Sequence, residues 1–180
     1  MQIHKKYYII CSMKMIVALH NIRSTYHVGA ILRTAEGLGL QGAILSGYTP
    51  RVHDKNLLPH LRDKLDREIH KTALGAEDML EIYAPGDIFS LLKKYRDEGW
   101  QIVGLENNIS EKTIYKLNDP ELGKVLKDKV ILMLGEEVSG ISPELYDLID
   151  LFVEIPMKGK KESFNVSVAA GIAMYGIMNL

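Results

Sequence analysis

The chain has 180 residues, of which 47% are hydrophobic and 25% charged, and its formal net charge is −1. This composition is typical of one soluble globular domain with a sizeable core, and it excludes a global basic field, so any nucleic-acid binding must use a local patch. Cys11 is the only cysteine, which excludes disulfides within the chain, argues against a cysteine zinc site and fits a reducing cytoplasm.

The N-terminus combines a basic start with a short apolar run, YYIIC. The run is too short for the core of a signal peptide, and no segment of the sequence is apolar over the length that a membrane span needs. We therefore expect residues 1–13 to form a short extension and residues 14–180 to form a single domain, without a membrane partner.

Short apolar runs alternate with helical patterns along that domain. Val28, Ile31, Leu32 and Ala35 recur at the spacing of a helix that Gly39 ends, and similar signals predict helices from about 88 to 95, from Ser142-Pro143 onward, and over 165–179. Strands without polar alternation are expected at 15–19, 42–46, 102–106, 130–134 and 151–155. This order predicts an α/β fold, with a mostly parallel sheet and helices on both faces.

The stretch from Tyr48 to Thr72 is the least regular part of the chain. Basic residues and histidines are interrupted here by four acids. Two interpretations remain open: a solvated face of a helix or loop, and a patch that faces RNA.

The last quarter of the chain, residues 155–177, carries the clearest signal of a site. A hydrophobic strand is followed by a loop with glycine and lysines, and then Ser163, Phe164 and Asn165 open a helix of small residues. Serine and asparagine oxygens accept hydrogen bonds from the first-turn amides of a helix, and a helix start behind such a loop is where α/β folds hold nucleotide-like ligands. The block therefore indicates a cofactor site.

Two further polar blocks, at 21–39 and 134–142, also follow predicted strands. In a parallel sheet these blocks and the last one lie at the same edge, where ligands bind. None of them is a dinucleotide fingerprint, because Gly37-x-Gly39 closes a helix instead of opening one. The sequence also contains no P-loop and no HExxH motif, and we predict no metal site.

Taken together, the three blocks resemble the three motifs of the SpoU/TrmH family, which are S-adenosylmethionine-dependent RNA 2′-O-ribose methyltransferases of the SPOUT class. The resemblance runs from about Met15 to Leu180, and the segment KTALGAE (71–77) resembles another common family element. It implies a C-terminal trefoil knot and a homodimer with composite active sites. Periodicity does not predict a knot, since true knots are almost absent from proteins.

The resemblance also implies roles for individual residues. Arg33 matches the family's catalytic arginine, and because arginine is hard to deprotonate, we expect it to clamp a substrate phosphate. The residues that match catalytic positions are Arg33, Asn21, Glu137, Ser163 and Asn165. The S-adenosylmethionine site would be bounded by Leu105, Gly135, Ile155, Met157, Ser163 and Phe164. Substrate contacts are expected from Arg23, His27, Arg51, Lys71 and Lys158, the last together with Lys160 and Lys161.

Two positions depart from the family pattern: His27 stands where asparagine is usual, and Phe164 where leucine is usual. The sequence therefore predicts methylation of ribose in structured RNA, tRNA or rRNA. A catalytically weak RNA-binding module of the same fold is the alternative, and His27 is its direct support. A base-methylating SPOUT enzyme is disfavoured by the Asn21-x-Arg23 and Arg33 pattern. The simpler interpretation of Ser163 and Asn165, as helix caps, is compatible with a site role.

Overall fold

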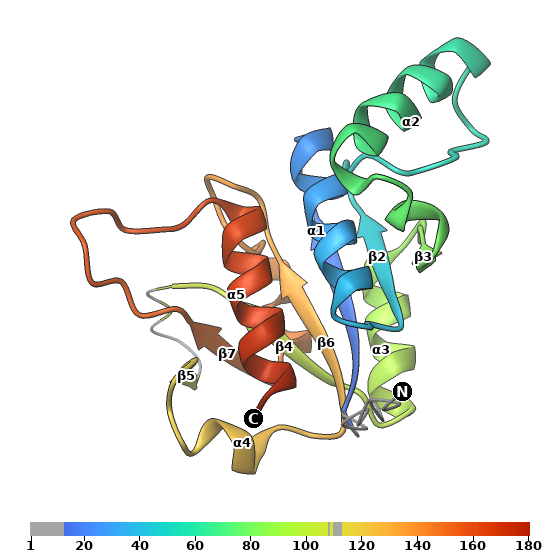
Figure 1. Ribbon diagram of the computed structural model, residues 1–180. Helices are drawn as coiled ribbons and strands as arrows, with labels where there is room; N and C mark the ends of the chain where they lie inside the picture. Colours follow the sequence, from blue (N-terminus) through green and yellow to red (C-terminus); the bar gives the residue numbers. More distant parts are fainter. Residues whose placement is uncertain (1–12, 108, 110–112) are drawn as a thin grey trace, which may run out of the picture.

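The computed structural model describes residues 13–107, 109 and 113–180, and its centre is one parallel sheet (Figure 1). The seven strands lie in the order β3-β2-β1-β6-β4-β7-β5, and every pair of neighbours is parallel. The strands are β1 Lys14–His20, β2 Gly42–Ser46, β3 Glu81–Tyr83, β4 Gln101–Leu105, β5 Ile114–Lys116, β6 Lys129–Leu134 and β7 Leu151–Glu154. All their carboxyl ends therefore meet at one edge.

Helices cover both faces of this sheet. The helices are α1 Thr25–Gly37, α2 Pro59–Ala73, α3 Ile88–Asp97, α4 Leu122–Val125 and α5 Val166–Met178, with 3₁₀ turns η1 Ala76–Asp78 and η2 Pro143–Leu148. One face carries α1 and α5 side by side, with α2 packed on α1, whereas α3 and η2 lie on the other face (Figure 1). This confirms the predicted α/β class.

The core explains why the strand sequences lack polar alternation. Along β1, Val17 and Leu19 pack with the α1 and α5 side, whereas Ile16 and Ala18 pack with α3 and η2. All four side chains are buried. An apolar residue is therefore required at every position, as expected for a parallel sheet between two helical layers.

The five predicted strands and the helices near 25–37, 88–97 and 166–178 are present. The short edge strands β3 and β5 were not predicted, because three residues are too few to show a period.

The irregular stretch contains nearly all of α2, a 15-residue helix whose mixed charges obscured its hydrophobic pattern. The segment after Ser142 is a 3₁₀ helix, and Ser142 makes no side-chain cap bond. The predicted extension, except residue 13, lies outside the described residues, and β1 begins at Lys14.

The strand order places β4 between β6 and β7, both of which follow it in the chain. The chain must therefore cross β4 on its way from β6 to β7, and it does so through η2 on the α3 side. Among the residues that the structure describes, no helix is both long and apolar enough to cross a membrane.

The loop between β2 and α2 is tied down by a histidine with two carboxylates. His53 Nδ1 lies 3.2 Å from Asp66 on α2, and His53 Nε2 lies 2.9 Å from Asp78 in η1. These contacts, that with Asp78 foremost, raise the pKa of His53 above 6.5. His20 behaves in the opposite way, because burial lowers its pKa.

We expect the two histidines to titrate on opposite sides of pH 6.5 in an NMR titration of the imidazole rings. A raised pKa in the folded state means that the His53 contacts stabilise the fold fully below pH 6.5 and lose their contribution as the pH rises through the folded pKa. Amide exchange in residues 50–58 should therefore accelerate as the pH rises through the folded-state pKa of His53. The increase should exceed the intrinsic one, for which the variant His53→Gln is the control. A His53 pKa at or below that of His20 would contradict this assignment.

Candidate functional site

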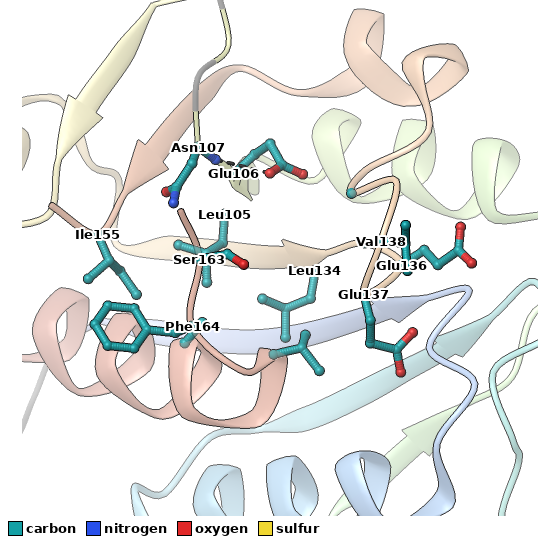
Figure 2. A pocket seen from close by; sticks show the side chains of 14 residues that line it. Leu105, Glu106, Asn107, Leu134, Glu136, Glu137, Val138, Ile155, Ser163 and Phe164 are labelled. Atoms are coloured by element: carbon teal, nitrogen blue, oxygen red, sulfur yellow. Dashed lines mark hydrogen bonds between the residues drawn. The ribbon is translucent and has the colours of Figure 1, made fainter. Parts of the chain in front are cut away.

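A pocket lies at the carboxyl edge of the sheet, where β6, β4 and β7 end side by side (Figure 2). Its cavity volume is about 160 Å³, and it is partly open to solvent. The lining residues are Leu105, Glu106, Asn107, Leu134, Gly135, Glu136, Glu137, Val138, Gly140, Ile155, Ser163, Phe164, Val166 and Ala169. The second and third sequence blocks thus meet around one cavity.

The turn after β6 forms one wall of the pocket and depends on two glycines. Glu136 and Gly140 exchange backbone hydrogen bonds of 2.9 and 3.0 Å, and Gly140 has a left-handed φ of 71°. A Cβ on Gly135 would lie 2.2 Å from the backbone of Gly140 and Ile141, closer than real Cβ contacts allow. Gly135 is thus required for the fold of this wall.

Glu106 and Asn107, at the end of β4, connect the three loops around the pocket. The Glu106 carboxylate accepts hydrogen bonds from the backbone N–H groups of Ile141 and Asn107, both at 3.0 Å. The Asn107 amide donates to the Glu162 carbonyl at 3.1 Å, which ties down the loop before α5. Sequence reasoning missed both residues as site members, although two polar residues directly after a buried strand were the available signal.

The start of α5 faces the start of α1 across the site. Asn165 is the N-cap of α5: its Oδ1 accepts from the Ser167 N–H at 3.0 Å and from the Ser167 hydroxyl at 2.7 Å. Its amide nitrogen lies 3.3 Å from His27 Nε2 on α1. The predicted capping role of Asn165 is confirmed, and His27, the residue that departs from the family pattern, has a defined contact with it. Ser163 lines the pocket without acting as the cap.

The loop after β1 brings a cation to the rim of the pocket. Asn21 has a left-handed φ of 63°, and its side-chain oxygen accepts from the Tyr48 N–H at 3.2 Å, so it shapes the backbone here. Arg23 Nε lies 3.7 Å from Glu136. Hydrogen bonds from Ser139 and then Tyr48 hold the pKa of Glu136 below its usual range. Glu136, which sequence reasoning did not select, is therefore the acid that pairs with Arg23. Glu137 lines the cavity.

Other predicted residues lie outside this pocket. Met157 lines an adjoining hollow with Asn107 and Ile155. Arg51 donates to the Pro85 carbonyl at 3.2 Å, and the Lys71 ammonium lies 5.8 Å from the centre of the Tyr26 ring. Lys158 is exposed on the loop before α5. The further members of this loop, Lys160 and Lys161, are exposed as well.

Arg33 is exposed in the second half of α1 and does not line the pocket of its own chain. Among the described residues it has no hydrogen-bond or ion-pair partner. The described part of the chain also holds no cluster of three histidine, cysteine or acidic side chains that suits a metal ion.

A sequence model of the SpoU rRNA Methylase family matches residues 14–175 of the chain. This range includes the blocks at 21–39 and 134–142, the last block as far as residue 175, and every pocket residue. The chain belongs to this family. Its likeness extends to curated members, among them the 23S rRNA (guanosine-2′-O-)-methyltransferases RlmB of Pseudomonas aeruginosa and Xylella fastidiosa. Identity is 29% over 91% of this chain with the first and 30% over 89% with the second. The chain spans 58% and 57% of the length of these two relatives.

Solved structures share the family fold. An AdoMet-bound rRNA methyltransferase from Sinorhizobium meliloti superposes with a TM-score of 0.74 over 92% of this chain, at 22% identity. The SpoU methyltransferase AviRb from Streptomyces viridochromogenes, also bound to AdoMet, gives a TM-score of 0.70 over 92%, at 22% identity. The chain covers 56% and 57% of these two structures. At this identity the likeness concerns the fold.

Proposed function

We propose that this SpoU-family chain transfers a methyl group from S-adenosylmethionine to a ribose 2′-hydroxyl of structured RNA, rRNA or tRNA. The observation that carries the proposal is the convergence of the second and third sequence blocks on one pocket at the carboxyl edge, with the first block at its rim. The names of the curated relatives support the reaction, since both are 2′-O-methyltransferases of 23S rRNA.

The residues present fit S-adenosylmethionine. Leu105, Leu134, Ile155 and Phe164 offer an apolar surface of the kind that an adenine ring needs. Hydroxyl and carboxylate groups of the same pocket can hydrogen-bond the ribose, and the carboxylates oppose the positive charge of a sulfonium and an ammonium group. When bound, the cofactor supplies an electrophilic methyl group on a positively charged sulfur that leaves as a neutral thioether.

The remaining task for the protein is to place the 2′-hydroxyl in line with that methyl group and to let its proton leave. Arg33 cannot act as a base, because its guanidinium stays protonated in proteins. Its planar group instead suits bidentate binding of a phosphate next to the reacting ribose, which leaves the phosphate or a water molecule to accept the proton. Arg23 pairs with Glu136 at the rim, and this position supports a contact between Arg23 and the RNA strand.

The position of Arg33 favours a homodimer in which each site takes this arginine from the partner. Three apolar side chains of α5, which packs beside α1, remain exposed: Val168 at 49%, Ile172 at 36% and Tyr175 at 62%. A second copy would cover them, because exposed apolar patches on one helix face mark association surfaces. The trefoil knot implied by the family resemblance belongs to the same proposal.

The test is transfer of radiolabelled methyl from S-adenosylmethionine to total rRNA and total tRNA, followed by mapping of 2′-O-methyl sites. We expect label in ribose of at least one RNA, and S-adenosylmethionine binding by calorimetry. Tight cofactor binding without transfer to any RNA would instead support the weak RNA-binding module, and label in a base would overturn the ribose assignment.

A further inference from the structure

Helix α2 carries a basic stripe, defined here as His60, Lys64, Arg67 and Lys71, that the pocket does not use. These residues follow one another at intervals of four, three and four, so they lie on one face of the helix. All four are exposed. The stripe extends over twelve residues, and the eleven steps between its ends span roughly 17 Å at 1.5 Å per residue.

The acids of α2 do not neutralise this stripe, because each has a contact elsewhere. Asp63 lies 3.6 Å from Arg62, Asp66 is held by His53, and Glu68 accepts from the Thr25 hydroxyl at 3.4 Å. In the described part of the chain, Lys64, Arg67 and Lys71 have no carboxylate within ion-pair distance. Three cations of one helix face are thus available to an anionic partner, although the whole chain has a net charge of −1.

One end of the stripe lies beside the candidate site. Lys71 packs over the ring of Tyr26 in the first turn of α1, and the Thr72 hydroxyl donates to the Tyr26 carbonyl at 3.0 Å. The same end of α1 carries His27, which contacts Asn165 at the start of α5. From there α2 projects beyond the sheet, away from β2 (Figure 1). The stripe is therefore a continuation of the site's rim.

We propose that the basic stripe binds the sugar-phosphate backbone of a double-stranded RNA stem next to the target nucleotide. A straight, rigid row of cations matches phosphates at the regular spacing of an A-form helix, which proteins recognise by shape and backbone. Proteins that bind single strands combine basic grooves with aromatic side chains on which the bases stack. Among the described residues, Tyr26, beneath Lys71 at one end, is the aromatic ring in contact with the stripe. The inference rests on the proposed function, to which it adds the RNA structure recognised.

The test compares the wild-type chain with the triple variant Lys64→Gln, Arg67→Gln, Lys71→Gln, which removes three charges and keeps good helix formers. The control variant Lys93→Gln, Lys94→Gln, Lys127→Gln removes three exposed lysines near the opposite edge of the sheet. Binding is measured without cofactor, at several salt concentrations. The probes are an RNA hairpin with a fully paired stem of about 16 base pairs and an unpaired RNA of equal length.

We expect the stripe variant to bind the hairpin at least about tenfold more weakly at low salt, with a salt slope reduced by about 2 to 3, whereas the control variant binds like the wild type. An unchanged slope and affinity would overturn the proposal, and so would an equal loss on the unpaired RNA. The measurement needs no methyl transfer. A wild type that binds the hairpin through the stripe but methylates nothing would therefore contradict the proposed function without contradicting the RNA-binding role of the stripe.

Discussion

Replacing Gly135 with alanine is expected to abolish binding of S-adenosylmethionine. The new Cβ would lie 2.2 Å from backbone atoms of Gly140 and Ile141, and backbone cannot yield as a flexible side chain does. The turn after β6 must therefore move, and it forms one wall of the pocket. We expect a loss of affinity of at least about 100-fold in calorimetry, together with a decrease in the free energy of unfolding of about 1–3 kcal/mol in urea.

Gly37→Ala provides the matched control for this substitution. Gly37 is the last residue of α1, it is exposed, and a Cβ there would meet nothing within 4 Å. Alanine at a compatible helix position raises the free energy of unfolding by about 0.4–1 kcal/mol, and cofactor affinity should not change. If Gly135→Ala binds S-adenosylmethionine as tightly as Gly37→Ala, the cofactor does not use this pocket.

Arg33→Ala is expected to reduce methyl transfer by about 100- to 1,000-fold, the effect of removing a charged group from a transition-state site, with unchanged cofactor affinity. The reason for the split is geometric, since Arg33 does not line the pocket of its own chain. Arg33→Lys keeps the charge but loses the planar fork, so we expect it to recover only part of the rate. Transfer rates under single-turnover conditions and calorimetry on the same samples measure both quantities. A weakened cofactor affinity equal to the loss of rate would assign Arg33 to the cofactor pocket instead.

Mixing two inactive variants tests whether an active site combines residues of two chains or is formed within one chain. After Arg33→Ala and Gly135→Ala chains are mixed and allowed to exchange partners, a mixed dimer contains one intact pocket opposite one intact Arg33. Random pairing should then restore activity to about a quarter of the wild-type level. Ala169→Phe, which places a bulky side chain in the pocket, can replace Gly135→Ala if that variant fails to fold. No recovery with either partner, in mixtures where dimers are shown by sedimentation, would refute the composite site.

The agreement between sequence and structure is best where the signal is local. The strand at 42–46 is present with the predicted bounds, because a short apolar run, Ala43 to Leu45, between two glycine-containing turns has few alternatives. The capping role of Asn165 also follows from its own neighbours, since the bonds that it makes reach only two residues along the chain. Five of the six predicted cofactor residues line one pocket, because ends of parallel strands share an edge.

The contacts that the sequence did not predict share one physical cause. Glu106 acts in the site through the amide of Ile141, 35 residues away, and Glu136 pairs with Arg23 across more than a hundred positions. Arg51, which is expected to contact the substrate, donates to the carbonyl of Pro85, 34 residues away. None of these partners is visible until the strands are ordered in the sheet.

The sequence alone determined the α/β class, the positions of five strands and of helices α1, α3 and α5, the family and the blocks that surround the pocket. These features depend on hydrophobic period, on helix-start chemistry and on motifs that are continuous in the chain. Only the tertiary structure decided that β4 lies between β6 and β7, that Glu136 rather than Glu137 holds Arg23, and that Arg33 lies away from its own pocket. Those facts come from contacts between residues far apart in sequence, and such contacts form only when the sheet order brings the loops together.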